Sequence, residues 1–342
     1  MAGARLREVA RLTLAGSTGL ARTLEEADQG LRRPVSTSRR VAVVQADGGA
    51  GATTTLAGAA TALAQRRPAA VLTVDAAAGA AALVAATRAP EPLPWTVARG
   101  ATAGLVRAAD ARAALPVGRG GLRVLGDGTA SSPWPPGPRA WREAVDPVGR
   151  FFDVVLTDWG VRPSTDLGVV AGDHHVVAVV ARADRGPAER GAVLAARLAT
   201  GAHDGFAPGR LDAGVAGAGS GRPGGGGTGA SRVGGPGAAV VPGAGPGGAG
   251  LLDGVSGDGW RAPAVVLVLV DVGGTAGRTD TVARDALDGL PVSVVSVPHD
   301  VLLGRGDVVA GTAVKAAWSA LASHLLARAC DPSSALADGQ VA

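Results

Sequence analysis

The chain has 342 residues, of which 46% are hydrophobic and 18% are charged, a composition typical of globular rather than disordered proteins. The 33 basic and 29 acidic residues leave a net charge of +4, which is too small for a protein that coats nucleic acid with its whole surface. One cysteine excludes an intramolecular disulfide, and no apolar run reaches the roughly 18 residues of a membrane-spanning helix, so we expect a cytoplasmic protein.

Residues 1–38 form a basic N-terminal segment in which arginines recur between short apolar stretches. This pattern is typical of an amphipathic helix that docks on a protein partner or lies peripherally on an anionic membrane. Nonspecific DNA contact through the arginines is another interpretation. A further alternative is a leading helix with a solvated basic face, and Gly16 and Gly19 disfavour a long helix here. The arginines of the segment are Arg5, Arg7, Arg11, Arg22, Arg32 and Arg33, and Arg39 and Arg40 follow directly after it.

From residue 39 onward, short Val-rich runs alternate with Ala/Leu-rich stretches, which predicts parallel strands joined by helices. The expected fold class is therefore α/β, with a doubly wound, mainly parallel sheet and helices on both faces. Strands are expected at residues 41–46, 70–75, 122–126, 153–158, 175–181, 264–271 and 292–297, and helices at 53–65, 188–199, 279–287 and 308–328.

A glycine-rich stretch interrupts this alternation, because 17 of the 38 residues from 213 to 250 are glycine. Such a composition buries too little apolar surface to offset the entropy of ordering the chain. We therefore expect residues 207–261 to be a flexible insertion within one domain. The domain itself is expected to comprise residues 39–206 and 262–330, and residues 331–342 to be a disordered tail.

Residues 41–54, VAVVQADGGAGATT, predict a strand, a glycine-rich turn and the start of a helix. A turn of this kind directs backbone N–H groups into one concavity at a helix N-terminus, which favours anion binding. The turn resembles the deviant Walker A motif, K-G-G-x-G-K-T-[ST], of the MinD/ParA family of P-loop ATPases. Asp47 and Ala52 stand where the family has its two lysines, and the other positions of the motif are Gly48, Gly49, Ala50, Gly51, Thr53 and Thr54.

Three further segments resemble this family in the same order. Residues 71–83 are similar to its second strand and following turn, with Asp75 retained and Ala77 in place of a second acidic residue. Residues 151–160, FFDVVLTDWG, resemble the Walker B strand, with Asp158 in the magnesium-associated position. Residues 292–307 are similar to the adenine-side loop of MinD-like proteins encoded with type VII secretion systems.

The resemblance implies a MinD/ParA-like P-loop NTPase fold and a site for ATP or ADP with magnesium. It implies that Thr53 and Asp158 hold the magnesium ion if nucleotide binds. Arg162 follows Asp158 closely and Arg182 ends the fifth strand at the same carboxyl edge of the sheet, so both are candidates to replace the missing lysine charge. Each of these residues has an alternative role. Thr53 could cap the N-terminus of the helix, and Asp158 could act as a cap or pair with an arginine. The two arginines could form ion pairs with Asp166 and Asp184. The candidate nucleotide-binding residues are Gly48, Gly49, Ala50, Gly51, Ala52, Thr53, Thr54, Asp75, Asp158 and Arg162.

Three functional groups of the family are absent from these positions. Its lysines at the positions of Asp47 and Ala52 contact nucleotide phosphates, and its acid at the position of Ala77 helps to orient the attacking water. A carboxylate about 5 Å from a triphosphate adds about 3 kcal/mol of repulsion per unit charge at an effective dielectric near 20. We therefore expect neither tight ATP binding nor efficient hydrolysis, and assign no catalytic residue. Trp159, where a small residue is usual, is expected to fill the vacated space or to be an exposed loop residue.

These observations favour a noncatalytic regulatory or scaffolding pseudo-ATPase of a secretion, pilus or partitioning system, with a protein partner or a homodimer. The alternative is a weak ATPase of the MinD/ParA type, involved in positioning or chromosome partitioning, that uses Arg162 or Arg182 with Asp158 and Thr53. The two differ in whether ATP with magnesium binds and is hydrolysed.

Overall fold

The computed structural model describes residues 19–77, 82–90, 93, 95–126, 135–201, 263–273, 279–300 and 310–331. The insertion expected at 207–261, residues 1–18 of the basic segment and the tail from residue 332 lie outside these ranges, as do residues 301–307 of the adenine-side loop.

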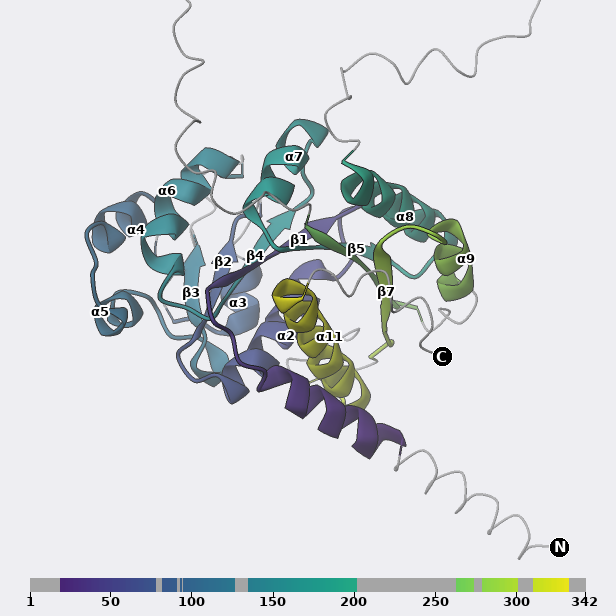
Figure 1. Cartoon of the computed structure of the whole chain (residues 1–342), viewed down its shortest axis with the longest axis horizontal. Coiled ribbons are helices and arrows are strands. Elements are labelled where there is room, and N and C mark those ends of the chain that lie inside the picture. Colours follow the sequence, from purple (N-terminus) through teal and green to yellow (C-terminus); the bar gives the residue numbers. More distant parts are fainter. Residues whose placement is uncertain are drawn as a thin grey trace, which may run out of the picture. The chain divides into compact units, whose positions relative to one another are not determined.

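Within the described residues, seven parallel strands form one sheet in the order β3-β2-β4-β1-β5-β6-β7 (Figure 1). The expected α/β fold with a parallel sheet is confirmed, and each strand lies within two residues of its expected ends. The central strands are buried on both faces, which explains their continuous Val-rich sequences. The strands are β1 Arg39–Gln45, β2 Val71–Asp75, β3 Arg123–Gly126, β4 Val154–Gly160, β5 Val176–Arg182, β6 Ala264–Val270 and β7 Val292–Val297.

Helices cover both faces of the sheet and form two separate cores with it (Figure 1). Successive residues of a strand point to opposite faces, so in β4 Leu156 belongs to one core and Val155 to the other. The first face carries a helix over residues 19–31, α2 (Ala52–Arg66), α3 (Ala82–Thr87) and α11 (Thr312–Cys330). The second face carries α4 (Trp95–Thr102), α5 (Ala108–Ala113), α6 (Pro138–Gly149), α7 (Ser164–Asp173), α8 (Arg185–Thr200) and α9 (Thr279–Ala286).

Helices α2 and α11 lie in close contact on the first face. A Cβ atom added at Gly58 of α2 would come within 2.1 Å of the Trp318 ring of α11, so only glycine fits there without displacing the tryptophan. This contact places α11 beside the helix that follows the glycine-rich turn.

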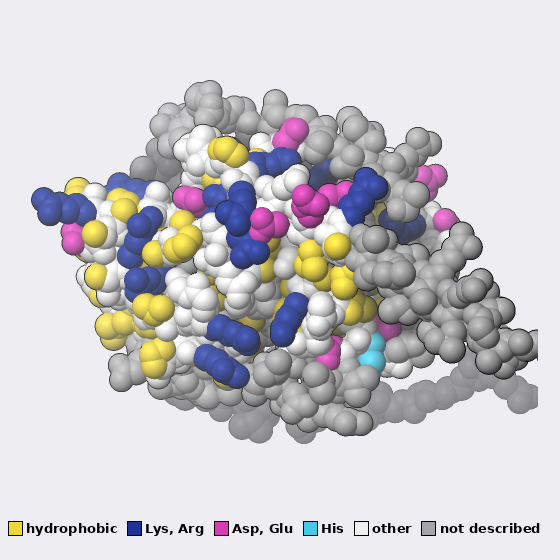
Figure 2. Space-filling view, turned by 90° about the horizontal axis from the view of Figure 1, so that it is seen from below, with side chains coloured by type: hydrophobic (Ala, Val, Ile, Leu, Met, Phe, Trp, Pro, Cys, Tyr) yellow, Lys and Arg dark blue, Asp and Glu magenta, His cyan; other side chains and the backbone are white. Residues whose placement is uncertain are grey.

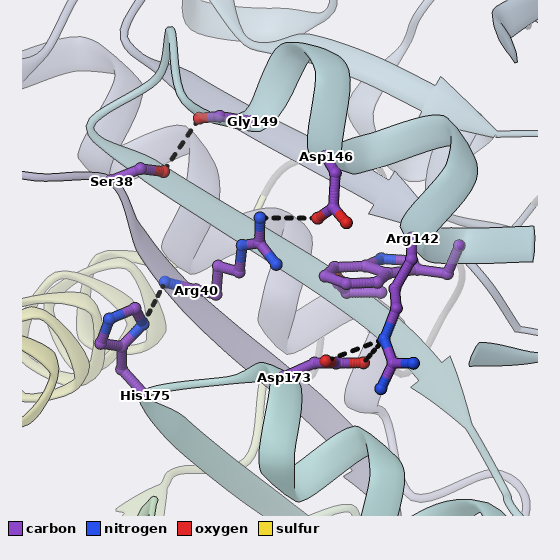
Figure 3. A network of polar contacts seen from close by, with 9 residues as sticks. Ser38, Arg40, Arg142, Asp146, Gly149, Asp173 and His175 are labelled. Atoms are coloured by element: carbon purple, nitrogen blue, oxygen red, sulfur yellow. Dashed lines mark hydrogen bonds and ion pairs between the residues drawn. The ribbon is translucent and has the colours of Figure 1, made fainter. Parts of the chain in front are cut away.

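A polar network ties β1 to α6, α7 and β5 at the amino edge of the sheet (Figure 3). The Arg40 guanidinium pairs with Asp146 at 2.8 Å, and the Arg40 backbone N–H donates to Nδ1 of His175 at 3.1 Å. Arg142 of α6 pairs with Asp173, the last residue of α7, at 2.8 Å. The glycine-rich turn lies at the other end of β1, so this network supports the scaffold rather than the candidate site.

Candidate functional site

The glycine-rich turn connects the end of β1 to the start of α2. Gly49 and Gly51 have φ angles of +75° and +79°, a left-handed conformation that L side chains rarely adopt. A Cβ atom at Gly48 or Gly49 would meet no atom within 4 Å, so the turn borders open space there. Gly51 is the N-cap residue of α2, and no side chain caps that helix. The interpretation of Thr53 as an N-terminal cap is therefore wrong.

Thr53 instead contacts the end of β4. Its hydroxyl donates a hydrogen bond to Oδ2 of Asp158 at 2.6 Å, and the Gly160 backbone N–H donates to Oδ1 of the same carboxylate at 3.0 Å. Asp158 is fully buried, and burial raises its pKa, although these hydrogen bonds and the Arg162 charge oppose the shift. The structure thus brings together the two side chains that the sequence predicts as magnesium ligands.

A second carboxylate lies beside Asp158. Asp75, the last residue of β2, is the register partner of Asp158 on the neighbouring strand. Burial and the Asp158 charge raise the pKa of Asp75 to about 6, although the Leu83 backbone N–H donates to its carboxylate at 3.2 Å. Two carboxyl groups therefore lie next to each other in the buried part of the site, and burial raises the pKa of both. Among the described residues, no group of three or more His, Cys, Asp or Glu side chains could hold a metal ion.

The two lysine positions of the motif have different surroundings. The Ala52 side chain is fully buried in the core beneath α2, so this position contributes a methyl group and no cation. Asp47 instead forms an ion pair with Arg190 of α8, with its two carboxylate oxygens 3.0 Å from Nε and Oδ2 2.9 Å from a terminal guanidinium nitrogen. Asp47 is therefore not the isolated negative charge that the motif alone indicates, because its partner lies 143 residues away in the chain.

Arg162 and Arg182 are both engaged in ion pairs. The buried Arg162 guanidinium donates to the carbonyl oxygens of Trp159 and Ala76 and lies 3.7 Å from Asp166. Burial lowers the pKa of Arg162, and the nearby carboxylates oppose that shift. Arg182 pairs with Asp184 at 2.6 Å. The expected ion-pair alternatives are confirmed, and a role of either arginine as a replacement cation stays a prediction.

Trp159 points away from the glycine-rich turn. Its ring packs on the second face of the sheet, with ring centroids 5.6 Å from Trp141 and 6.0 Å from His174. Adjacent strand residues face opposite sides, so Trp159 cannot share the face of Asp158. The expectation that Trp159 fills nucleotide space is wrong, and so is its alternative as an exposed loop residue.

Two hollows flank the turn. One, of about 180 Å³, is lined by Gly49, Gly51 and Thr54, by residues of β6, β7 and α11 such as Trp318, and by Asp271, which follows β6. The other, of about 430 Å³, lies on the α7 and α8 side. The first hollow is below the 300 to 1,000 Å³ range typical of small-molecule sites. It adjoins residues 298–300, the described part of the segment that the sequence predicts for the adenine side.

No protein-family model and no curated protein sequence matches the chain. Among solved structures, it is similar to a ParA family ATPase from Chlorobium tepidum TLS, with 14% identity, a TM-score of 0.50, and coverage of 88% of this chain and 96% of that one. It also aligns with the cell division ATPase MinD of Pyrococcus furiosus, with 15% identity, a TM-score of 0.48, and coverage of 84% of this chain and 98% of that one. A MinC:MinD cell division complex from Aquifex aeolicus aligns with 15% identity, a TM-score of 0.48, and coverage of 84% of this chain and 96% of that one. The chain therefore has a MinD/ParA-like P-loop fold.

Proposed function

We propose that this chain is a noncatalytic pseudo-ATPase, a regulatory or scaffolding protein of a secretion, pilus or partitioning system. The observation that carries the proposal is the buried methyl group of Ala52 at the lysine position of the phosphate loop. The similarity of residues 292–307 to MinD-like proteins of type VII secretion loci supports a secretion system over the other two. The proposal includes a cytoplasmic location.

The charges around the turn do not fit a tightly held triphosphate. Asp75 and Asp158 lie side by side in the site, and no lysine of the motif is present to balance them. Each carboxylate about 5 Å from a phosphate charge costs about 3 kcal/mol at an effective dielectric near 20. Nucleotide binding that depends on backbone N–H groups alone is therefore expected to be weak.

A weak ATPase remains the second candidate, because part of the site is intact. Thr53 and Asp158 are in direct contact at 2.6 Å, and Gly49 and Gly51 have the left-handed conformation that the turn requires. A hydroxyl and a carboxylate are suitable oxygen ligands for Mg²⁺. This candidate requires that Arg162 or Arg182 replace the missing lysine charge beside Asp158 and Thr53.

Calorimetric titration with ATP and magnesium tests the proposal, with ADP and magnesium-free titrations beside it. The native chain should bind ATP no tighter than about the millimolar range. Ala52→Lys should gain about tenfold or more, because one charge-assisted contact contributes about 1.5 to 3 kcal/mol. Ala52→Met, a neutral side chain of similar length, should gain nothing. Micromolar affinity of the native chain together with phosphate release would instead establish the ATPase candidate.

We also propose a protein partner or a homodimer whose assembly does not depend on nucleotide. In the described part of the basic segment, Arg22 pairs with Glu26 at 2.7 Å and Arg32 with Asp28 at 2.8 Å, which weakens the case for a membrane or DNA surface there. On the face shown in Figure 2, basic side chains likewise lie among acidic and hydrophobic ones. No helix within the described ranges is long and apolar enough to cross a bilayer. Sedimentation that shows dimers only with ATP would contradict nucleotide-independent assembly.

A further inference from the structure

The ion pair between Asp47 and Arg190 joins the first residue of the glycine-rich turn to helix α8. The ion pair is bidentate, with three nitrogen-oxygen distances of 2.9 to 3.0 Å. Both side chains are partly exposed, 32% for Asp47 and 58% for Arg190. An exposed pair contributes little to folding stability, so another anion can replace Asp47 at small cost.

Arg190 also borders a hollow beside the start of the turn. It lines the hollow of about 430 Å³ together with Gln45 and Ala46, the two residues that precede Asp47. Its neighbour in the sequence, Glu189, pairs with Arg185 at 2.9 Å. The carboxylate in contact with Arg190 is therefore that of Asp47. A guanidinium binds phosphate with the same bidentate geometry that it uses for carboxylate.

We propose that Asp47 and Arg190 form a latch that closes the glycine-rich turn to phosphate, and that Arg190, once released, is a phosphate-binding residue supplied by α8. The Asp47 carboxylate takes the place of a phosphate on Arg190 and also repels one that approaches the turn. The latch rests on the proposed function, since it explains how a loop without lysines is kept from binding anions. The ligand class is a polyphosphate, including the polyphosphate group of a nucleotide.

Binding of inorganic tripolyphosphate to the full chain tests the latch without any contribution from a nucleoside. Asp47→Asn should bind tripolyphosphate about tenfold more tightly than the native chain, because a repulsive charge is lost and Arg190 is freed. Arg190→Gln should bind no better than the native chain. The double variant should lose the gain of Asp47→Asn. Asp146→Asn, which removes a carboxylate from the Arg40 pair at the opposite edge of the sheet, controls for net charge and should behave as native.

Hydrogen exchange of the unliganded chain supplies a readout that needs no ligand. Both Asp47→Asn and Arg190→Gln should speed amide exchange in residues 47–51, because each breaks the link to α8, while the strands keep their native protection. Unchanged tripolyphosphate binding in Asp47→Asn would overturn the proposal. An equal gain in the double variant would also overturn it, since Arg190 would then bind no phosphate. Tight ATP binding with hydrolysis by the native chain would contradict the pseudo-ATPase function, whereas these variant comparisons test the latch alone.

Discussion

Asp47 and Ala52 replace the two lysines of one motif, yet their surroundings make them different substitutions. Ala52 is a buried methyl group and removes a charge from the site. Asp47 reverses a charge, and Arg190 of α8 pairs with it at 2.9 Å. The repulsion that the sequence predicts from Asp47 is therefore partly offset by a residue from another element. At Ala52 the side chain is a methyl group and supplies no cation, and the weak nucleotide binding that we propose rests on this position.

Asp75 provides a pH-dependent test of the buried carboxylate pair. Its pKa of about 6 lies above the ordinary value of 3.8, so the folded state binds its proton more tightly than the unfolded state. Ionisation of the buried Asp75 carboxyl therefore lowers the free energy of unfolding. This destabilisation is absent well below pH 4, grows between pH 4 and 6 and is complete above pH 6. Asp75→Asn should raise the free energy of unfolding by about 2 to 3 kcal/mol at pH 7.5 and by less than half of that at pH 4.5.

Urea unfolding at the two pH values measures this difference. Asp146→Asn is a suitable control, because it removes a half-exposed carboxylate that pairs with Arg40. That variant should show little change at either pH. A loss of stability in Asp75→Asn at pH 7.5 would mean that the hydrogen bond from the Leu83 N–H outweighs the cost of the buried charge.

At the scale of elements, the contact of α2 with α11 depends on one glycine. Gly58→Ala would place a methyl group 2.1 Å from the Trp318 ring, which must then move. We expect a loss of about 1 to 3 kcal/mol in the free energy of unfolding, despite the better helix propensity of alanine. Gly100→Ala in α4 is the matched control, because a Cβ atom there meets nothing within 4 Å. It should be neutral or stabilise by up to about 1 kcal/mol.

Urea denaturation of both variants measures these effects. If Gly58→Ala changed the free energy of unfolding no more than Gly100→Ala does, α2 and α11 would have to accommodate the added methyl group without a loss of stability. The close contact between them would then not be a constraint on the fold. The same variant should also alter the hollow of about 180 Å³, because Trp318 lines it.

Some helices were expected from the sequence and others were missed despite a helical pattern. Helices α2, α8 and α11 were expected close to their observed positions. Helix α6 was missed, although Trp141, Ala144, Val145 and Val148 are buried at that spacing. Pro147 lies inside this helix and obscures the pattern. The inward position of Trp159 could also have been predicted, because successive residues of a strand point to opposite faces and Asp158 precedes it.

For the molecule as a whole, two histidines at the amino edge of the sheet predict sensitivity to acid. Burial lowers the pKa of His174 to about 3 and that of His175 to about 4, and the nearby Arg40 contributes to both shifts. In the unfolded chain both protonate near pH 6.5. The unfolded state therefore binds more protons below pH 6.5, and stability falls as the pH drops from 6.5 toward 4. Each histidine contributes a slope of up to about 1.4 kcal/mol per pH unit, which Asp75 partly opposes between pH 6 and 4.

Unfolding free energies at pH 7.5, 6.0, 5.0 and 4.5 give the slope. His174→Gln should lower stability at pH 7.5, because packing against Trp141 at 4.9 Å is lost, but should flatten the dependence below pH 6.5. An unchanged slope in this variant would show that acid sensitivity arises elsewhere.

The pairing of Thr53 with Asp158 came from the resemblance to the MinD/ParA family, whereas residue patterns alone predicted the parallel α/β fold, the seven strand positions and the glycine-rich turn. Those features follow from residue spacing within short segments and from the rule that parallel strands end at one edge of the sheet. Only the tertiary structure decided which residue pairs with Asp47, how the two cores are composed and which face of the sheet each helix covers. Side chains such as Asp47 and Arg190 are 143 residues apart, and no local pattern records which surface helices will lie beside a given turn once the chain has packed.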